Sequence, residues 1–473
     1  MLSAKRQERQ PSTSEETNNG NQGSSSFMWL PTLVLPLLLV YISNQWSRSS
    51  IYYLVDFDAG ADAFTAMNVA IGFTEAQYGL LASLAFTALF AIASLGAGLA
   101  ADRYNRKTLT MVAAAGWSLA TIGTAISTTY GQVLTWRIAM GLFCAFSTPT
   151  AYTLINQKVP SDKKSLATSV YGTGVAFGGA LASLSILLDN QIGWQQAMLV
   201  IGGVGFASAA IVFLFLPDDD KSNKNIQPEI DTKENVDEPA SFLADFAEAL
   251  STNRAKWIFL GSFLRFSSGL CIGVWSAPFF RMTFPENAGN YAVAQAFITA
   301  VAGSTSGLIG GATADYLSSQ VSGSKNENPS VDSNGVRLWV PVVGSLLAAP
   351  SWYLATHAAD SFQVAMIWLS VEYLVAECWF GPTISTLLST VPSKVGGTAQ
   401  GMFTLTGGIA NIAPTALGYF YGQLTTGQES SSELQSLLSA VVCFGYISSA
   451  ICFALGAQSP PPEVTTSSRV KAS

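Results

Sequence analysis

Five charged side chains interrupt long apolar stretches of this sequence. They are Arg48, Arg137, Arg265, Glu372 and Glu377. A charge at the centre of a membrane-spanning helix costs at least about 2.5–3.5 kcal/mol, so such residues usually face a water-filled cavity or a partner. Arginines in this setting bind anionic groups, and a carboxylate can pair with an arginine or take up a proton. We therefore expect these five residues to form a substrate-binding or coupling site.

Structural roles remain open for parts of this set. Arg137 and Arg265 lie within about nine residues of the ends of their apolar stretches, so their side chains could extend to the membrane surface. Glu377 could instead be buried in its protonated form and make a hydrogen bond between helices. Arg48 has the polar neighbours Asn44 and Ser47, and this surrounding favours a wet cavity.

Other chemistries find little support in the sequence. All five cysteines fall inside apolar stretches, with no CxxC pair and no cysteine–histidine cluster, so neither a disulfide framework nor a zinc site is expected. The chain has one histidine and no Walker A motif. Its net charge is −7, and no basic stripe is present. We expect no cofactor, no metal, no enzymatic activity and no nucleic-acid binding.

The elements that must position the charged residues are membrane-spanning helices. Of the 473 residues, 49% are hydrophobic and 11% are charged, whereas about 25% are charged in an average soluble domain. A bilayer core needs about 20 apolar residues per helix. This criterion predicts an all-α membrane protein with twelve spans, near residues 28–54, 76–100, 107–128, 133–156, 165–188, 194–217, 257–281, 291–313, 337–357, 362–390, 397–422 and 434–457.

A polar segment divides the predicted spans into two groups. We expect a disordered tail at 1–27, a six-helix bundle at 28–217, a linker with an amphipathic helix at 218–256, a second six-helix bundle at 257–457 and a tail at 458–473. The first tail lacks an apolar core, so no signal peptide is expected. All but four of the 23 lysines and arginines lie in the tails and in the loops of one side. This asymmetry predicts a multi-pass protein with both termini in the cytoplasm.

Short segments recur in the same order in both groups of spans. Gly-Leu-Ala-Ala-Asp at 98–102 follows the second span, and Gly-Ala-Thr-Ala-Asp at 311–315 follows the eighth. The segments 149–155 and 382–388 end the fourth and tenth spans, and each is soon followed by Val-Pro-Ser. The chain is therefore expected to consist of two homologous six-helix halves. A midplane site between two such halves is typical of secondary transporters.

The loop after the second span suggests a family. The sequence Gly98-x-x-Ala-Asp102-Arg103-Tyr-Asn-Arg106-Lys107 resembles the loop signature of the major facilitator superfamily. Its Asp-Arg-Tyr-Asn-Arg-Lys form is similar to that of the spinster-like branch. The resemblance implies the major facilitator fold, alternating access, and lysophospholipid or sphingoid-type substrates.

The resemblance also implies a conformational latch in this loop. Its members would be Gly98, Asp102, Arg103, Arg106 and Lys107, with Asp315 at the corresponding place in the second half. Asp102 would pair with basic residues near a neighbouring helix end and release them when the protein opens. The basic residues could instead act as a positive-inside anchor. In the second half Tyr-Leu-Ser replaces the basic residues, so we expect a weaker latch there.

The sequence departs from the spinster-like pattern at two carboxylates. Arg48 and Arg137 match its two arginines, but Ser47 and Cys144 stand where its acids would be. Neither a hydroxyl nor a thiol is a ready proton carrier near neutral pH. Aligning the two halves places Glu377 opposite Cys144. We therefore expect Glu377 to line the cavity, where it pairs with an arginine or takes up a proton.

Together these observations predict a secondary transporter of an anionic or zwitterionic amphipathic molecule. The resemblance favours a lysophospholipid or sphingoid-type lipid, with a proton gradient as the driving force. Its partners would be this substrate, membrane lipids and protons. A carrier of small organic anions with the same fold is one alternative. A non-transporting membrane sensor that signals through residues 218–256 is the other.

Overall fold

The computed structural model describes residues 29–57, 66–160, 163–216, 242–323, 333–392, 395–424 and 431–460. Within these residues the secondary structure is helical and no strand is present, as predicted. The tail predicted at 1–27 lies outside the described residues, as do residues 218–241 of the linker and 461–473 of the second tail. The remainder of the linker contains a short helix, α11 (Phe242–Ala249).

Several helices of the N-terminal half are preceded by a residue whose side chain accepts a hydrogen bond from a backbone N–H of the first helical turn. Thr74 accepts from the N–H of Gln77, and Asn105 does so from that of Thr108. Such caps fix where a helix starts. The helices are η1 (Leu30–Val34), α2 (Leu35–Ser49), η2 (Ser50–Tyr52), α3 (Met67–Ile71), α4 (Glu75–Gly79), η3 (Leu80–Leu84), α5 (Ala85–Arg103), α6 (Arg106–Ala125), α7 (Tyr130–Cys144), α8 (Ser147–Lys158), α9 (Lys164–Gly172) and α10 (Gly174–Phe215).

The C-terminal half repeats the interruptions of the N-terminal half. The π-helical segment η3 breaks the second long helix of the first half, and a π-helical segment, η5, breaks the second long helix of the second half. The helices are α12 (Asn253–Thr283), η4 (Pro285–Asn287), α13 (Ala288–Phe297), η5 (Ile298–Gly303), α14 (Ser304–Gly323), α15 (Ser333–Val336), α16 (Trp339–His357), α17 (Phe362–Ala376), η6 (Glu377–Trp379), α18 (Phe380–Thr390), α19 (Gly396–Ala410), α20 (Ile412–Leu424) and α21 (Ser431–Gln458).

Nine helices of the described residues are long and apolar enough to cross a membrane. The twelve predicted spans correspond to these nine helices as follows. The fifth and sixth predicted spans form one helical run, Leu166–Phe215, which bends at Gly193, where φ is +78°. The first predicted span is divided among η1, α2 and η2, and the eleventh is divided at Asn411 between α19 and α20. Neither of these two spans is among the nine.

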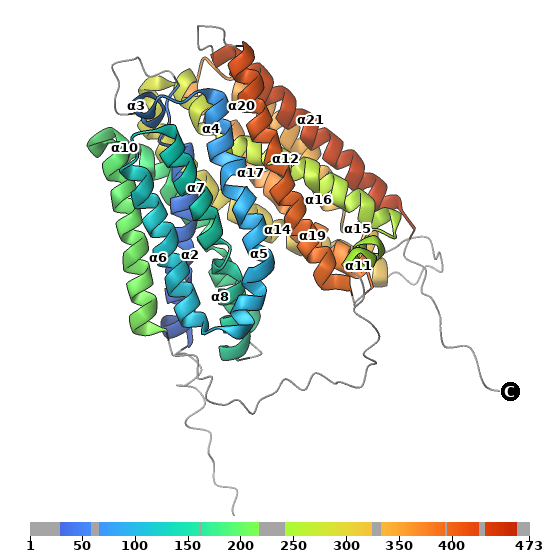
Figure 1. Cartoon of the computed structure of the whole chain (residues 1–473). Helices are drawn as coiled ribbons and strands as arrows, with labels where there is room; N and C mark the ends of the chain where they lie inside the picture. The colour runs from blue at the N-terminus through green and yellow to red at the C-terminus, as the bar shows by residue number, and fades with distance from the viewer. Residues whose placement is uncertain are drawn as a thin grey trace, which may run out of the picture.

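The two halves share one apolar core at one end of the molecule and have separate cores at the other. The shared core, which includes Tyr78, Met198, Trp275 and Trp352, contains residues of both halves. The separate cores belong to the N-terminal half and to the C-terminal half alone. At the shared end α4 packs on α20 and α10 packs on α13. We call this the closed end, and Figure 1 shows the halves diverging toward the opposite, open end.

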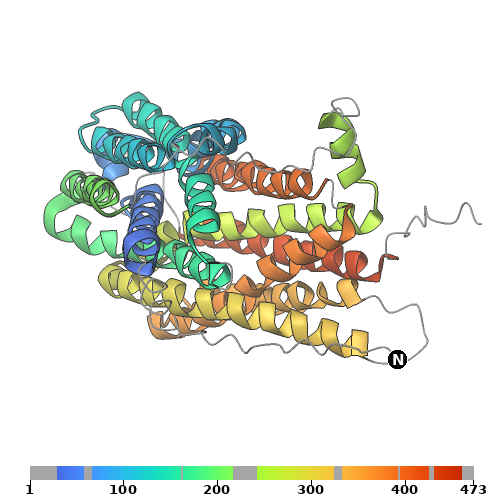
Figure 2. The same cartoon turned by 90° about the horizontal axis from the view of Figure 1, so that it is seen from below.

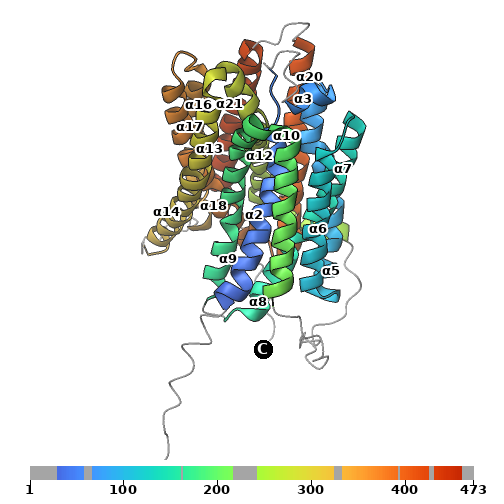
Figure 3. The same cartoon turned by 90° about the vertical axis from the view of Figure 1, so that its left-hand side faces the viewer.

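Both ends of the described chain lie at the open end. The first helix starts there at Leu30, and α21 finishes there near Gln458 (Figure 1). Seen from this end, the helices of the two halves form two adjacent groups (Figure 2). From the side of the N-terminal half, α2 lies beside α10 along its length (Figure 3). This arrangement places α2 and α7, which contain Arg48 and Arg137, in the N-terminal half and α12, which contains Arg265, in the other.

Candidate functional site

Two arginines of the N-terminal half meet on one aromatic ring. The guanidinium carbon of Arg48, on α2, lies 4.8 Å from the ring centre of Phe86, on α5. The guanidinium carbon of Arg137, on α7, lies 5.3 Å from the same ring. A cation over an aromatic face is stabilised by about 0.5–2 kcal/mol. Phe86 is buried, so its position fixes where the two guanidinium groups can lie.

Arg137 is held in place by the interrupted helix. Its Nε donates to the carbonyl of Leu81 at 3.0 Å, and its Nη2 donates to that of Ala82 at 3.5 Å. Both carbonyls belong to η3, where the change from α-helical hydrogen bonding leaves backbone oxygens free to accept from a side chain. Arg137 is only 3% exposed. The sequence left open that Arg137 extends to the membrane surface, but its hydrogen bonds lie inside the bundle.

The groups around these arginines are neutral. No carboxylate of the described residues forms an ion pair with Arg48 or Arg137. The Cys144 thiol is close enough to both guanidinium groups to interact electrostatically with them. Asn44 is 3% exposed and its side chain interacts with the Cys144 thiol, while its amide nitrogen has no hydrogen-bond acceptor among the described residues. The site therefore has two positive charges and a free N–H donor, and these groups suit an anion.

The C-terminal half holds its arginine differently. Arg265, on α12, donates through Nη2 to Glu377 Oε1 at 3.2 Å and to the carbonyl of Ala376 at 2.9 Å. Its guanidinium carbon lies 5.4 Å from the Trp379 ring and 4.8 Å from the Tyr446 ring. The Ala376 carbonyl is accessible to a side chain because the α-helix changes to the short 3-10 segment η6 at Glu377. Glu377 is 43% exposed, whereas Arg265 is buried.

The second predicted acid of this half has its own partner. Glu372 is 2% exposed and its Oε1 accepts a hydrogen bond from the Tyr446 hydroxyl. Because the Tyr446 ring also lies against Arg265, both acids are connected to the same guanidinium group. The structure thus brings Arg265, Glu372 and Glu377 together. Arg48 and Arg137 form a separate group in the other half.

A third charged cluster ties the halves together at the closed end. Arg281, at the end of α12, donates to the carbonyls of Tyr53 and Val55 at 2.9 and 3.2 Å. It donates to Asp56 Oδ2 at 3.1 Å, and Asp189 Oδ2 lies 3.9 Å away. Arg281 belongs to the C-terminal half, and its four partners belong to the N-terminal half. The sequence analysis identified neither Arg281 nor Asp189 as a site residue, and Asp189 directly follows the predicted span 165–188.

The predicted latch loop is described in part. Gly98 lies within α5, and the side chain of Asp102 lies outside the described part of the structure, so the Asp102 latch stays a prediction. Arg103 is exposed at the end of α5, and Arg106 donates to Gln157 at 2.7 Å. Lys107 lies 5.6 Å from the ring centre of Phe213.

The second half supplies a basic partner that the sequence did not reveal. Asp315 pairs with Arg337 Nη2 at 3.2 Å, across the segment 324–332. The residues directly after Asp315 contain no basic side chain, and Arg337 lies 22 positions later, between α15 and α16.

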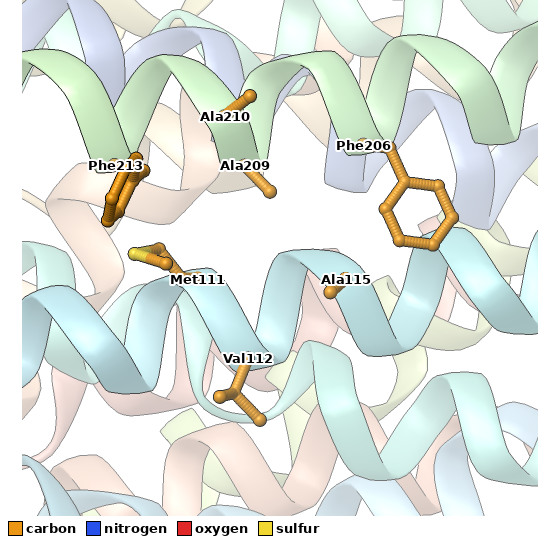
Figure 4. A pocket seen from close by; sticks show the side chains of 7 residues that line it. All are labelled: Met111, Val112, Ala115, Phe206, Ala209, Ala210 and Phe213. Carbon is orange, nitrogen blue, oxygen red and sulfur yellow. The ribbon is translucent and has the colours of Figure 1, made fainter.

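An apolar groove of about 370 Å³ lies between α6 and α10. Figure 4 shows that its walls contain Met111, Val112, Ala115, Phe206, Ala209, Ala210 and Phe213, all apolar. None of the five predicted site residues lines it. Within the described residues no group of three or more His, Cys, Asp or Glu side chains is placed to hold a metal ion.

Comparison with known proteins gives a consistent family match. The family model described as Major Facilitator Superfamily matches residues 26–414. The D-galactonate transporter of Escherichia coli O6:H1 is 24% identical over 366 residues, covering 74% of this chain and 81% of that protein. The 4-hydroxybenzoate transporter of Pseudomonas aeruginosa is 31% identical over 181 residues, covering 36% of this chain and 39% of that protein.

The fold also matches solved structures. A bacterial homologue of the human lysosomal transporter Spinster, in an inward-facing and unoccupied conformation, has a TM-score of 0.66 to this chain at 18% identity. The match covers 93% of this chain and 96% of that one. The nucleoside transporter NupG has a TM-score of 0.63 at 14% identity, with 91% and 99% covered. At these identities the likeness describes the fold.

Proposed function

Because the chain belongs to the Major Facilitator Superfamily, we propose that it is a secondary transporter of small organic anions that works by alternating access. As a member of this family it is an integral multi-pass membrane transporter and not an enzyme. The observation that carries the choice of substrate is the pair of arginines on Phe86, neither of which has a carboxylate partner among the described residues. A substrate carboxylate would supply the missing negative charge.

The geometry supports a compact carboxylate. Arg48 is partly exposed and forms no hydrogen bond with the described residues, so the N–H groups of its guanidinium are available to a carboxylate. Arg137 is fixed by Leu81 and Ala82 and contributes mainly its charge. Asn44 offers a further N–H donor. The names of two relatives, a D-galactonate and a 4-hydroxybenzoate transporter, are those of carboxylate carriers and agree with this choice.

A lysophospholipid or sphingoid-type lipid remains the second candidate. The observation that favours it is the apolar groove between α6 and α10, which would suit an acyl chain. The groove contains none of the arginines, however, and a lipid substrate must bring its charged group to them. We rank the organic anion first for this reason.

We assign the open end to the cytoplasm. The tails and loops at this end contain most of the lysines and arginines, and basic residues are retained on the cytoplasmic side of a membrane. With this assignment, the conformation is inward-facing. Glu377 was expected either to pair with an arginine or to take up a proton, and its Oε1 lies 3.2 Å from Arg265 Nη2. This pairing supports a counter-ion role for Glu377, with proton coupling as the alternative.

The test is uptake of radiolabelled 4-hydroxybenzoate, D-galactonate and lysophosphatidylcholine into proteoliposomes loaded with the same unlabelled compound. We expect uptake of an organic acid, and Arg48→Gln should reduce it at least about tenfold, because a hydrogen bond to a charged group contributes about 1.5–3 kcal/mol. Lys256→Gln is the matched control, since Lys256 is an exposed cation at the start of α12. Uptake of the lysolipid alone would reverse the ranking, and saturable binding without flux of any compound would indicate a sensor.

The role of Glu377 needs a separate measurement. Uptake is compared with and without an imposed pH gradient for the unmodified protein and for Glu377→Gln. A gradient-dependent uptake that Glu377→Gln abolishes would establish proton coupling at this residue. A Glu377→Gln protein that transports normally at every pH would remove that role.

A further inference from the structure

The arginines inside the helical bundles differ in how their charge is compensated. Arg265 pairs with Glu377, and Arg281 lies near both Asp56 and Asp189. Arg48 and Arg137 have no carboxylate partner in the described part of the chain. The C-terminal site is therefore balanced when it is empty, while the N-terminal site is not. An empty carrier keeps this excess of positive charge.

This excess matters when the site is sealed from water. In the structure Arg48 is partly exposed, so water from the open end can solvate its guanidinium group. Alternating access requires both ends to close in turn, and closure removes this water. After closure, Arg137 would retain its hydrogen bonds to the carbonyls of Leu81 and Ala82. After closure, the Arg48 guanidinium would retain only its cation–π contact with Phe86 and its neutral neighbours. An unpaired charge is strongly disfavoured in such surroundings.

On this basis, and resting on the proposed function, we propose that the protein is an obligate anion exchanger. A bound carboxylate neutralises Arg48, so the loaded carrier closes and reorients. The empty carrier closes rarely, because closing would bury Arg48 without a counter-charge. Each anion that enters must therefore be replaced by one that leaves, and the gradient of the counter-anion drives transport. For two monoanions the exchange moves no net charge.

The first experiment compares loaded with empty proteoliposomes. Uptake of radiolabelled 4-hydroxybenzoate is measured into liposomes that contain unlabelled 4-hydroxybenzoate and into liposomes without it, and D-galactonate is used in a parallel series. The membrane potential is clamped with potassium and valinomycin. Uptake into loaded liposomes should be at least about tenfold faster, because burying an unpaired charge costs several times the energy that changes a rate tenfold. It should not change when a potential or a pH gradient is imposed.

The outcomes separate this inference from the proposed function. Equal initial rates into loaded and empty liposomes would overturn obligate exchange and leave the anion transporter intact. Exchange that responds strongly to the membrane potential would overturn the electroneutral step. No uptake of either anion under any loading would remove the proposed function and the exchange together.

A charge-restoring variant tests the physical cause. Cys144 lies within electrostatic range of both Arg48 and Arg137, so Cys144→Asp would place a negative charge where both guanidinium groups interact with it. The empty carrier would then be compensated, and the ratio of uptake into loaded and empty liposomes should fall toward one. Cys144→Asn is the matched control, because it has similar size and polarity without charge, and it should keep the high ratio. The ratio does not depend on how much protein folds, so a partial loss of folded protein leaves the test valid. An unchanged ratio in Cys144→Asp would overturn the charge argument.

Discussion

At the residue scale, the candidate site depends on contacts between side chains that are distant in sequence. Phe86 contacts both arginines of the N-terminal half, although nothing in its sequence position distinguishes it from other aromatic residues of the apolar stretches. The five predicted site residues are all inside the bundles, and three of them meet at Arg265. Phe86 and Tyr446 were not predicted, because an aromatic side chain in an apolar stretch gives no signal of its own, and Asn44 was named only as a polar neighbour of Arg48.

Phe86 gives a prediction at this scale. Phe86→Leu keeps an apolar side chain but removes the aromatic face, so both cation–π contacts are lost. Each is worth about 0.5–2 kcal/mol, and the KM for the transported anion should rise about threefold to thirtyfold. Phe86→Tyr is the control and should keep a KM close to that of the unmodified protein. Equal KM values for the two variants would show that the ring does not position the arginines.

At the element scale, interruptions of the long helices create the polar contacts. The π-helical segment η3 exposes the carbonyls that bind Arg137, and the 3-10 segment η6 exposes the carbonyl that binds Arg265. Each half thus has one arginine held by the backbone of a broken helix. The end of α12 adds Arg281, whose contacts with the loop after η2 and with α10 join the two halves.

The Arg281 cluster predicts how the closed end opens. Arg281→Gln removes the charge-assisted bonds to the segment Tyr53–Asp56 and leaves Asp189 without its cation. We expect amide hydrogen exchange of residues 50–57 to become at least about tenfold faster, since breaking a buried pair costs about 3–5 kcal/mol. The measurement is hydrogen–deuterium exchange with mass spectrometry on the purified protein.

The Asp315–Arg337 pair provides the control for this experiment. Asp315 is 76% exposed, and surface ion pairs contribute only about 0–1 kcal/mol. Asp315→Asn should leave exchange at residues 50–57 unchanged. If Arg281→Gln also leaves it unchanged, then apolar packing alone keeps this end closed.

At the scale of the whole molecule, the packing of α4 on α20 is one of the helix contacts that join the two halves at the closed end. A Cβ added at Gly418, on α20, would lie 2.7 Å from the Glu75 carbonyl and 2.7 Å from a ring carbon of Trp275. A Cβ added at Gly79, on α4, would lie 3.0 Å from the Pro414 carbonyl. The backbones approach this closely only because both positions are glycine. The hydroxyls of Ser83 and Thr415 hydrogen-bond across the same contact at 2.6 Å.

Gly418 supplies the prediction at this scale. Gly418→Val should prevent α4 and α20 from closing, so the protein stays open at this end and transport falls to background. The control is Gly401→Val on α19, where an added Cβ meets no atom within 4 Å. Both uptake and cross-linking across the closed end are measured. Normal transport by Gly418→Val would show that this contact is not needed for the transport cycle.

The sequence by itself determined the class of protein, the two-half architecture and the identity of the charged residues inside the bundles. Hydropathy, repetition and charge are local properties of the chain, and a membrane makes them informative because only apolar helices can cross it. The family followed from one loop and was confirmed by the match over residues 26–414. The choice of a lipid substrate rested on resemblance alone and now ranks behind a small organic anion.

The tertiary structure decided which charges are compensated. That Glu377 pairs with Arg265, that Glu372 accepts from Tyr446, and that Arg48 and Arg137 meet without an acid depend on how the helices are rotated and aligned against each other. Apolar surfaces on all sides of a membrane helix leave that rotation unspecified in the sequence pattern. The local breaks at η3 and η6 shift the alignment further, and a regular helical period does not predict them.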